Sequence, residues 1–94
     1  MTEGKKYDTG KPRWDLLPWD QLAHVVDVLT IGAEKYSDDN WQRVVPRTRY
    51  VAAFFRHATA PLRGQWLDDE SGKPHYAHAI ACLLFLMWFG GHDE

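Results

Sequence analysis

The chain is short of cysteine, of positive charge and of long apolar runs, and each shortage excludes a class of protein. A single cysteine, Cys82, excludes a disulfide framework and fits a reducing compartment. The formal net charge of −2 gives no basic field of the kind that binds nucleic-acid polymers. The apolar run 77–89 is shorter than the roughly 20 residues of a membrane span. Since the polar N-terminus also does not resemble a signal peptide, we expect a cytoplasmic protein without a membrane partner.

The sequence also lacks any long stretch of alternating apolar and polar residues, and this predicts an all-α protein. Helical spacing of apolar residues predicts helices over 19–36 and 48–64, and residues 74–89 form an almost wholly apolar third helix. Glycine and proline among charged residues predict an arm over 1–17 that becomes ordered on a ligand. We therefore expect one domain over 1–94, made of this arm, a helical bundle over 19–89 and a frayed tail over 90–94.

Aromatic residues, in contrast to cysteine, are abundant in this chain. They make up 14% of the chain and include five tryptophans, which is more apolar surface than three helices of this size can bury. We expect the bundle to be completed by oligomerisation, as a homodimer, a homotetramer or a larger homo-oligomer.

Two histidines mark the start of the third predicted helix. His75 and His78 are three residues apart and share a helix face, directly after an acidic turn. With Asp69 from that turn and His57 from the second helix they could hold a divalent metal ion, and nitrogen ligands favour manganese or another transition metal over magnesium. The alternative is that the acids only favour the positive end of the helix, with His57 packed in the core and the other two histidines ordinary amphipathic residues.

Arginine recurs every seven residues along the second predicted helix, at positions 49, 56 and 63. Guanidinium groups above the small side chains of Ala53 and Ala60 would make a shallow groove suited to phosphates. The alternative is a solvated stripe that pairs with the acidic face of another helix.

Four segments in this order resemble one known family: YDTGKPRWDLLP, GAEKYSDDNW, RYVAAFFRH and DDESGKPHYAHA. Together they are similar to the compact phage dATP/dGTP diphosphohydrolases, which are grouped with the all-α, MazG-like nucleotide pyrophosphohydrolases. The resemblance implies a MazG-like helical bundle that uses a divalent metal ion. It implies hydrolysis of a purine deoxynucleoside triphosphate to monophosphate and pyrophosphate, in the cytoplasm of a bacterial host if the chain is phage-encoded.

This chemistry needs charge neutralised on the phosphates and a water molecule held in line. We expect Glu34 to orient that water, with Asp38 equally placed one turn on. Asp69 and His78 would act in catalysis as well as in the metal site. Cations of the arm and of the second helix would hold the triphosphate: Lys11, Arg13, Arg56 and Arg63.

The nucleoside needs other contacts. Trp41 offers an aromatic face for stacking, and Asn40 or Asp15 can hydrogen-bond a purine edge. An arm of this composition can also be simply solvated, and that alternative applies to Lys11 and Arg13.

One departure from the resemblance leaves a second function open. MazG-like enzymes hold magnesium with a Glu-Glu-x-x-Glu helix and a Glu-x-x-Asp helix, whereas this chain has Arg56-His57 and His75-x-x-His78 in the comparable places. The alternative is a phage protein that binds or sequesters a nucleotide, or a nucleotide second messenger, without hydrolysing it.

Overall fold

The computed structural model describes residues 2–91, and they form three α-helices joined by short 3-10 helices. The α-helices are α1 (Trp19–Lys35), α2 (Thr48–Thr59) and α3 (His75–Gly91). The 3-10 helices are η1 (Trp14–Leu16), η2 (Asn40–Arg43) and η3 (Ala60–Arg63). Within residues 2–91 there is no strand, only an isolated bridge between Leu67 and Pro74, so the all-α prediction is confirmed.

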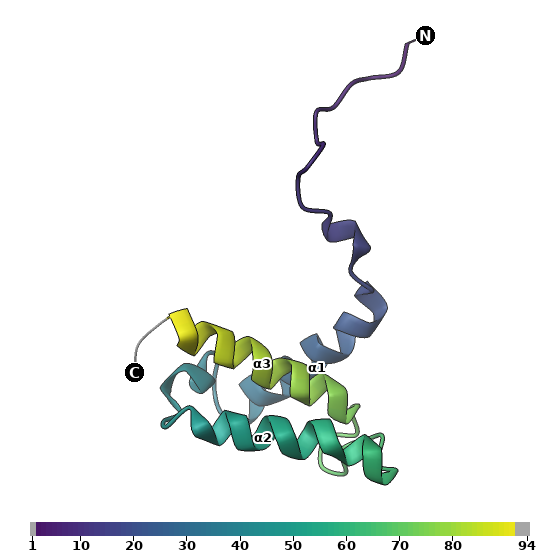
Figure 1. The fold of residues 1–94 in the computed structure, drawn as a ribbon. Helices are drawn as coiled ribbons and strands as arrows, with labels where there is room; N and C mark the ends of the chain where they lie inside the picture. The colour runs from purple at the N-terminus through teal and green to yellow at the C-terminus, as the bar shows by residue number, and fades with distance from the viewer. Residues whose placement is uncertain (1, 92–94) are drawn as a thin grey trace.

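The helix α3 packs on both other α-helices, and Figure 1 shows it running beside α2 and crossing in front of α1. Small residues at Ala77, Ala79 and Ala81 are buried along it and let neighbouring helices approach closely. The apolar stripe of α1 meets this side of α3 at Val25 and Val28, which form a core cluster with Ala77 and Ala81. The two neighbouring helices thus account for the buried apolar residues of α3 but not for those on its outer face.

The outer face of α3 remains uncovered in the single chain. Ile80, Leu84 and Met87 recur at helical spacing on this face and are 40%, 41% and 68% exposed. None of the helices in the described part of the chain is long and apolar enough to cross a membrane.

The helix boundaries differ from the predicted ones where proline and glycine intervene. Pro61 cannot donate a backbone hydrogen bond, and α2 gives way at Thr59 to η3, which contains this proline. Gly64 then ends η3 in the left-handed region, with φ of 86°. At the other end, α3 continues to Gly91, past the predicted helix end at 89, and the rest of the predicted tail, 92–94, lies outside the described residues.

The turn between η3 and α3 is closed by its own backbone. The Leu67–Pro74 bridge and the hydrogen bond from Asp68 N–H to the Lys73 carbonyl (2.8 Å) fold residues 68–73 back on themselves. Gly72 takes a positive φ of 73°, which allows the sharp return. This acidic turn lies beside the first turn of α3, where it can present side chains to the histidines.

The N-terminal arm leads away from the bundle (Figure 1). Residues 2–20 are all exposed, and the helical part of the arm is the single turn of η1. Only Leu17 and Pro18 separate η1 from α1, and the Pro18 carbonyl accepts the first hydrogen bonds of that helix, from Gln21 and Leu22.

Candidate functional site

Three histidines from two helices form one cluster. His57 on α2 and His75 on α3 approach through their Nδ1 atoms, which are 2.8 Å apart, so one ring donates a hydrogen bond to the other. His78, one turn along α3, stacks on His57 with ring centroids 4.5 Å apart and planes only 13° from parallel. The structure therefore brings together the three histidines that the sequence predicted to share a site.

The acidic turn adds Asp68 to this cluster. The backbone N–H of Ser71 donates to Asp68 Oδ2 at 2.8 Å, and the Ser71 hydroxyl lies 2.7 Å from His78 Nε2. Asp68 Oδ2 is itself 3.7 Å from the same nitrogen. Ser71 thus joins the carboxylate of the turn to an imidazole of α3 and holds both in place.

Burial sets the protonation of this cluster. It lowers the pKa of His57 from 6.5 to about 4, with the nearby His78 and His75 adding to the effect. Burial also lowers the pKa of His78, although the Asp68 carboxylate opposes that shift. For Asp68, burial acts to raise the pKa, but the hydrogen bonds from Ser71 and the neighbouring histidines outweigh it and leave the pKa below its usual value. Near neutral pH, His57 and His78 are therefore neutral and Asp68 is ionised.

Within residues 2–91, three of these groups are placed to share a metal ion. One ligand atom from each of His57, Asp68 and His75 lies within 4.8 Å of the other two. The acid in this set is Asp68, whereas the sequence analysis had chosen Asp69, which is exposed. His78 is part of the same cluster but is held by Ser71 instead of belonging to that ligand group.

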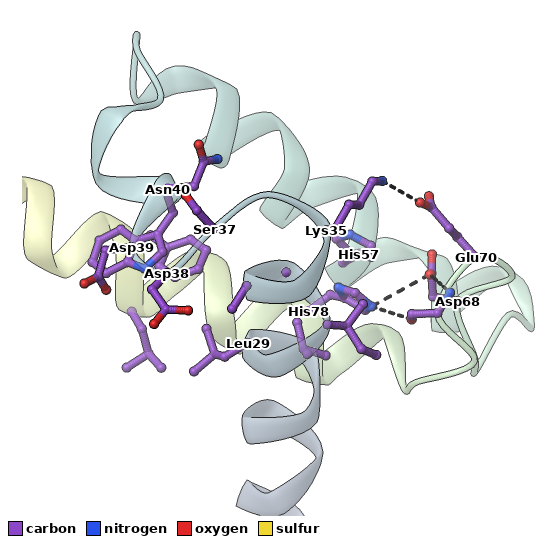
Figure 2. A pocket seen from close by; sticks show the side chains of 18 residues that line it. Leu29, Lys35, Ser37, Asp38, Asp39, Asn40, His57, Asp68, Glu70 and His78 are labelled. Atoms are coloured by element: carbon purple, nitrogen blue, oxygen red, sulfur yellow. Dashed lines mark hydrogen bonds and ion pairs between the residues drawn. The ribbon is translucent and has the colours of Figure 1, made fainter.

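His57, His78 and Asp68 of this cluster line one end of a groove with a volume of about 750 Å³. Figure 2 shows His57, His78 and Asp68 at this end, and Asp38, Asp39 and Asn40 at the other. The C-terminal half of α1 contributes the wall between the two ends, including Val28, Leu29 and Gly32. An ion pair from α1 to the acidic turn, Lys35 Nζ to Glu70 Oε1 at 2.7 Å, lies at the histidine end.

Two residues predicted to contact the nucleoside, Asn40 and Trp41, line this groove. The Trp41 ring stacks on Phe85 of α3 with centroids 4.4 Å apart and planes 14° from parallel. Its position is therefore fixed by α3, and it belongs both to the packing of the bundle and to the groove wall. Asp38, considered equal to Glu34 as a base, also lines the groove.

Other predicted site residues lie elsewhere. Glu34 is exposed and does not line the groove. Arg56, next to His57 in sequence, faces a separate cleft of about 580 Å³ that Arg49 also lines. Arg63 is exposed and donates to the Thr59 hydroxyl at 3.0 Å.

The three arm residues predicted to bind substrate, Lys11, Arg13 and Asp15, are exposed on the extended arm. Arg13 Nη2 lies 2.6 Å from Asp15 Oδ2, two residues along the chain, and both side chains remain exposed to solvent. In the single chain these residues are not brought to the groove.

Ser71 was not among the predicted site residues, and Asp69 was predicted in place of its neighbour Asp68. Helical or strand periodicity does not separate the two aspartates, because a turn has no repeating period. A usable signal was the spacing Asp68-x-x-Ser71, in which an aspartate side chain accepts from a backbone N–H further along a turn.

The comparisons with known proteins identify the same family that the four sequence segments resemble. A dATP/dGTP diphosphohydrolase of Salmonella phage PMBT28 is 36% identical to the chain over 85 residues, which is 90% of the chain and 29% of that protein. The chain thus spans less than a third of the length of this relative. No solved structure matches this chain. Residues 1–94 match the family described as dATP/dGTP diphosphohydrolase, N-terminal, and the chain belongs to that family.

Proposed function

We propose that the chain binds a purine deoxynucleoside triphosphate in the groove and takes part in its hydrolysis to monophosphate and pyrophosphate with a divalent metal ion. The observation that carries this proposal is the groove itself, which joins a cluster of histidines and a carboxylate to an aromatic and amide end. Its volume of about 750 Å³ is in the range of pockets that enclose small molecules. Family membership supports a nucleotide as the ligand.

The donor set fits a divalent metal ion. Metal ligation needs neutral imidazole and ionised carboxylate, and these are the forms that the surroundings of His57 and Asp68 favour near neutral pH. Two nitrogens and one oxygen suit manganese, zinc or another transition metal better than magnesium, which prefers oxygen. When bound, such an ion would supply positive charge to the phosphate oxygens of the substrate.

His78 would act beside that set as a proton acceptor. Its ring is neutral because burial lowers its pKa, and Ser71 fixes the direction of Nε2. In the proposed reaction a water molecule held near this nitrogen gives its proton to the ring as the water oxygen attacks the α-phosphorus, and the bond to the departing pyrophosphate breaks. Asp38, the equal alternative to Glu34, lines the groove but lies at the end opposite the histidines, so we assign it to the nucleoside and not to this water.

The far end of the groove would hold the base and sugar. Asn40 and Asp38 offer hydrogen-bonding groups to a purine edge, and the edge of the Trp41 indole forms part of the apolar wall. Because one face of Trp41 is covered by Phe85, only its remaining surface is free to contact a base.

The test is incubation with each dNTP and NTP under Mg²⁺, Mn²⁺, Co²⁺, Ni²⁺ and Zn²⁺, with chromatography of the products. We expect monophosphate and pyrophosphate from dATP or dGTP. Asp68→Asn should reduce metal affinity and turnover by about tenfold or more, while the matched variant Asp69→Asn should leave both unchanged. Equal effects of the two substitutions would contradict the proposed site.

The same incubation separates the alternative of a non-catalytic binder. The absence of the Glu-rich magnesium helices of MazG-like enzymes is the observation that favours it. A binder would deplete free nucleotide, and the intact triphosphate would be recovered after the protein is denatured.

A further inference from the structure

The chain exposes more surface than a compact protein of its size. Its accessible surface is 7537 Å², whereas a folded monomer of 10.9 kDa is expected to expose about 5,600 Å². The radius of gyration is 17.2 Å against about 12 Å expected for a compact chain of this length. The excess of accessible surface is roughly 1,900 Å². This is more than each partner buries in a stable interface, which is about 800 Å².

Much of this excess lies on the N-terminal arm and is apolar. Trp14, Leu16 and Trp19 are 71%, 69% and 53% exposed, and Tyr7 is 84% exposed. The hydrogen bonds of the arm within residues 2–17 run along the arm itself, such as Leu16 N–H to the Arg13 carbonyl at 3.1 Å. Large aromatic side chains of this kind are typical anchors of protein interfaces.

A matching apolar surface exists on α3. Its outer stripe of Ile80, Leu84 and Met87 is exposed, and Leu84 also lines the groove. The stripe is thus continuous with the groove, so a segment that packs on α3 reaches the groove edge.

The charges of the two parts are complementary. Four carboxylates line the groove: Asp38, Asp39, Asp68 and Glu70. Among the described residues Lys35 is the one lysine or arginine that lines it, and Lys35 is paired with Glu70. A triphosphate there needs more positive charge. The arm carries Lys11 and Arg13, and in the single chain Arg13 pairs with the neighbouring Asp15.

We propose that the arm of one copy docks on the α3 stripe of a second copy and completes the groove of that copy. Trp14 and Leu16 are the apolar anchors, and Lys11 and Arg13 are the cations that the second groove lacks. The identity of the ligand that these cations contact rests on the proposed function. The docking of the arm does not depend on that function.

The second copy is a better acceptor than the chain's own groove. The arm leads away from its own bundle, and the two-residue link between η1 and α1 contains no turn that reverses the chain. For the arm to reach its own groove, the chain would have to change direction at Leu17 and Pro18. A symmetric pair of copies exchanges two arms and needs no such change.

Cross-linking of mixed copies tests the docking without any nucleotide. One preparation carries Lys11→Cys and the other Asp39→Cys, and they are mixed, allowed to exchange and treated with a short bis-maleimide. The native Cys82 is buried and its pKa is raised by burial, so it should react slowly. We expect covalent pairs that contain one chain of each kind. Arg63→Cys in place of Asp39→Cys is the control, since Arg63 is exposed outside the groove, and it should give few pairs.

Two results would overturn the inference. In the first, a chain carrying both Lys11→Cys and Asp39→Cys forms only intramolecular cross-links, which would place the arm on the groove of its own chain. Absence of any cross-link above the Arg63→Cys control would mean that the arm does not dock.

Complementation tests the function of the docked arm. A chain lacking residues 1–13 keeps its groove, and a full-length His75→Gln chain keeps its arm. Each alone should bind a dNTP at least tenfold more weakly than the parent chain, and their mixture should regain binding, because each mixed pair holds one complete site. No recovery despite cross-linking would overturn the contribution of the arm to the site. If the parent chain binds no nucleotide while the cross-link forms, the proposed function fails and the docking stands.

Discussion

The Nδ1 atoms of His57 on α2 and His75 on α3 lie 2.8 Å apart, although 18 residues separate them in sequence. Both rings are partly or fully buried, and between them they hold one hydrogen bond. The pair thus ties the end of α2 to the start of α3 at the point where Asp68 approaches.

The stability of the metal-free chain should fall as the pH is lowered from 6.5 towards 4. His57 has its folded pKa lowered to about 4, so between these values the unfolded chain binds more protons and acid favours unfolding. The charged or titratable neighbours of His57 are His75, His78, Asp68 and Arg56. Urea unfolding with a chelator present, at several pH values, measures the effect. His57→Gln should flatten the dependence in this window, and an equally steep curve for that variant would assign it to other groups.

His75→Gln should weaken binding of Mn²⁺ or Co²⁺ by more than about tenfold, because it replaces one nitrogen of the proposed ligand group. The matched control is His24→Gln, since His24 lies on α1 and does not line the groove. Titration calorimetry gives the affinities and circular dichroism reports whether the fold is kept. Equal loss in both variants would show that the histidine cluster is not the metal site.

The same substitution should have opposite effects at two glycines. Gly72 has a positive φ of 73°, so Gly72→Ala should cost about 1–2 kcal/mol in free energy of unfolding. Gly32 lies inside α1 with open space around its Cα, so Gly32→Ala should stabilise by about 0.5–1 kcal/mol. Thermal or urea unfolding measures both. A neutral Gly72→Ala would mean that the acidic turn does not hold this backbone in solution.

Trp41→Ala should lower the free energy of unfolding by about 3 kcal/mol, because Trp41 stacks on Phe85 and also contacts Phe89 edge-on. Trp41→Phe keeps an aromatic ring and should cost less than half as much. If Trp41 also forms the base end of the groove, nucleotide affinity should be highest in the parent chain, lower in Trp41→Phe and lowest in Trp41→Ala. Affinity that is unchanged in a folded Trp41→Ala chain would remove Trp41 from the site.

The sequence by itself determined the parts of this protein that depend on local periodicity. The apolar spacing placed α1 within one residue of its observed end, and the three-residue spacing of His75 and His78 put them on one side of α3. Helical geometry repeats every 3.6 residues, so a residue's face follows from its position along the helix. The ordered motifs likewise identified the family that the comparisons show.

Only the tertiary structure decided which acids and cations reach the groove. Asp68 and Asp69 are neighbours in a turn, and the backbone bridge and Ser71 direct Asp68 to the histidines. Asp38 lies beyond the end of α1, where the helical period no longer sets its direction. Arg56 and His57 are about 100° apart around α2, and the packing of α2 on α3 turns His57 inward and leaves Arg56 on another side. These placements depend on contacts between segments far apart in sequence, which no local pattern encodes.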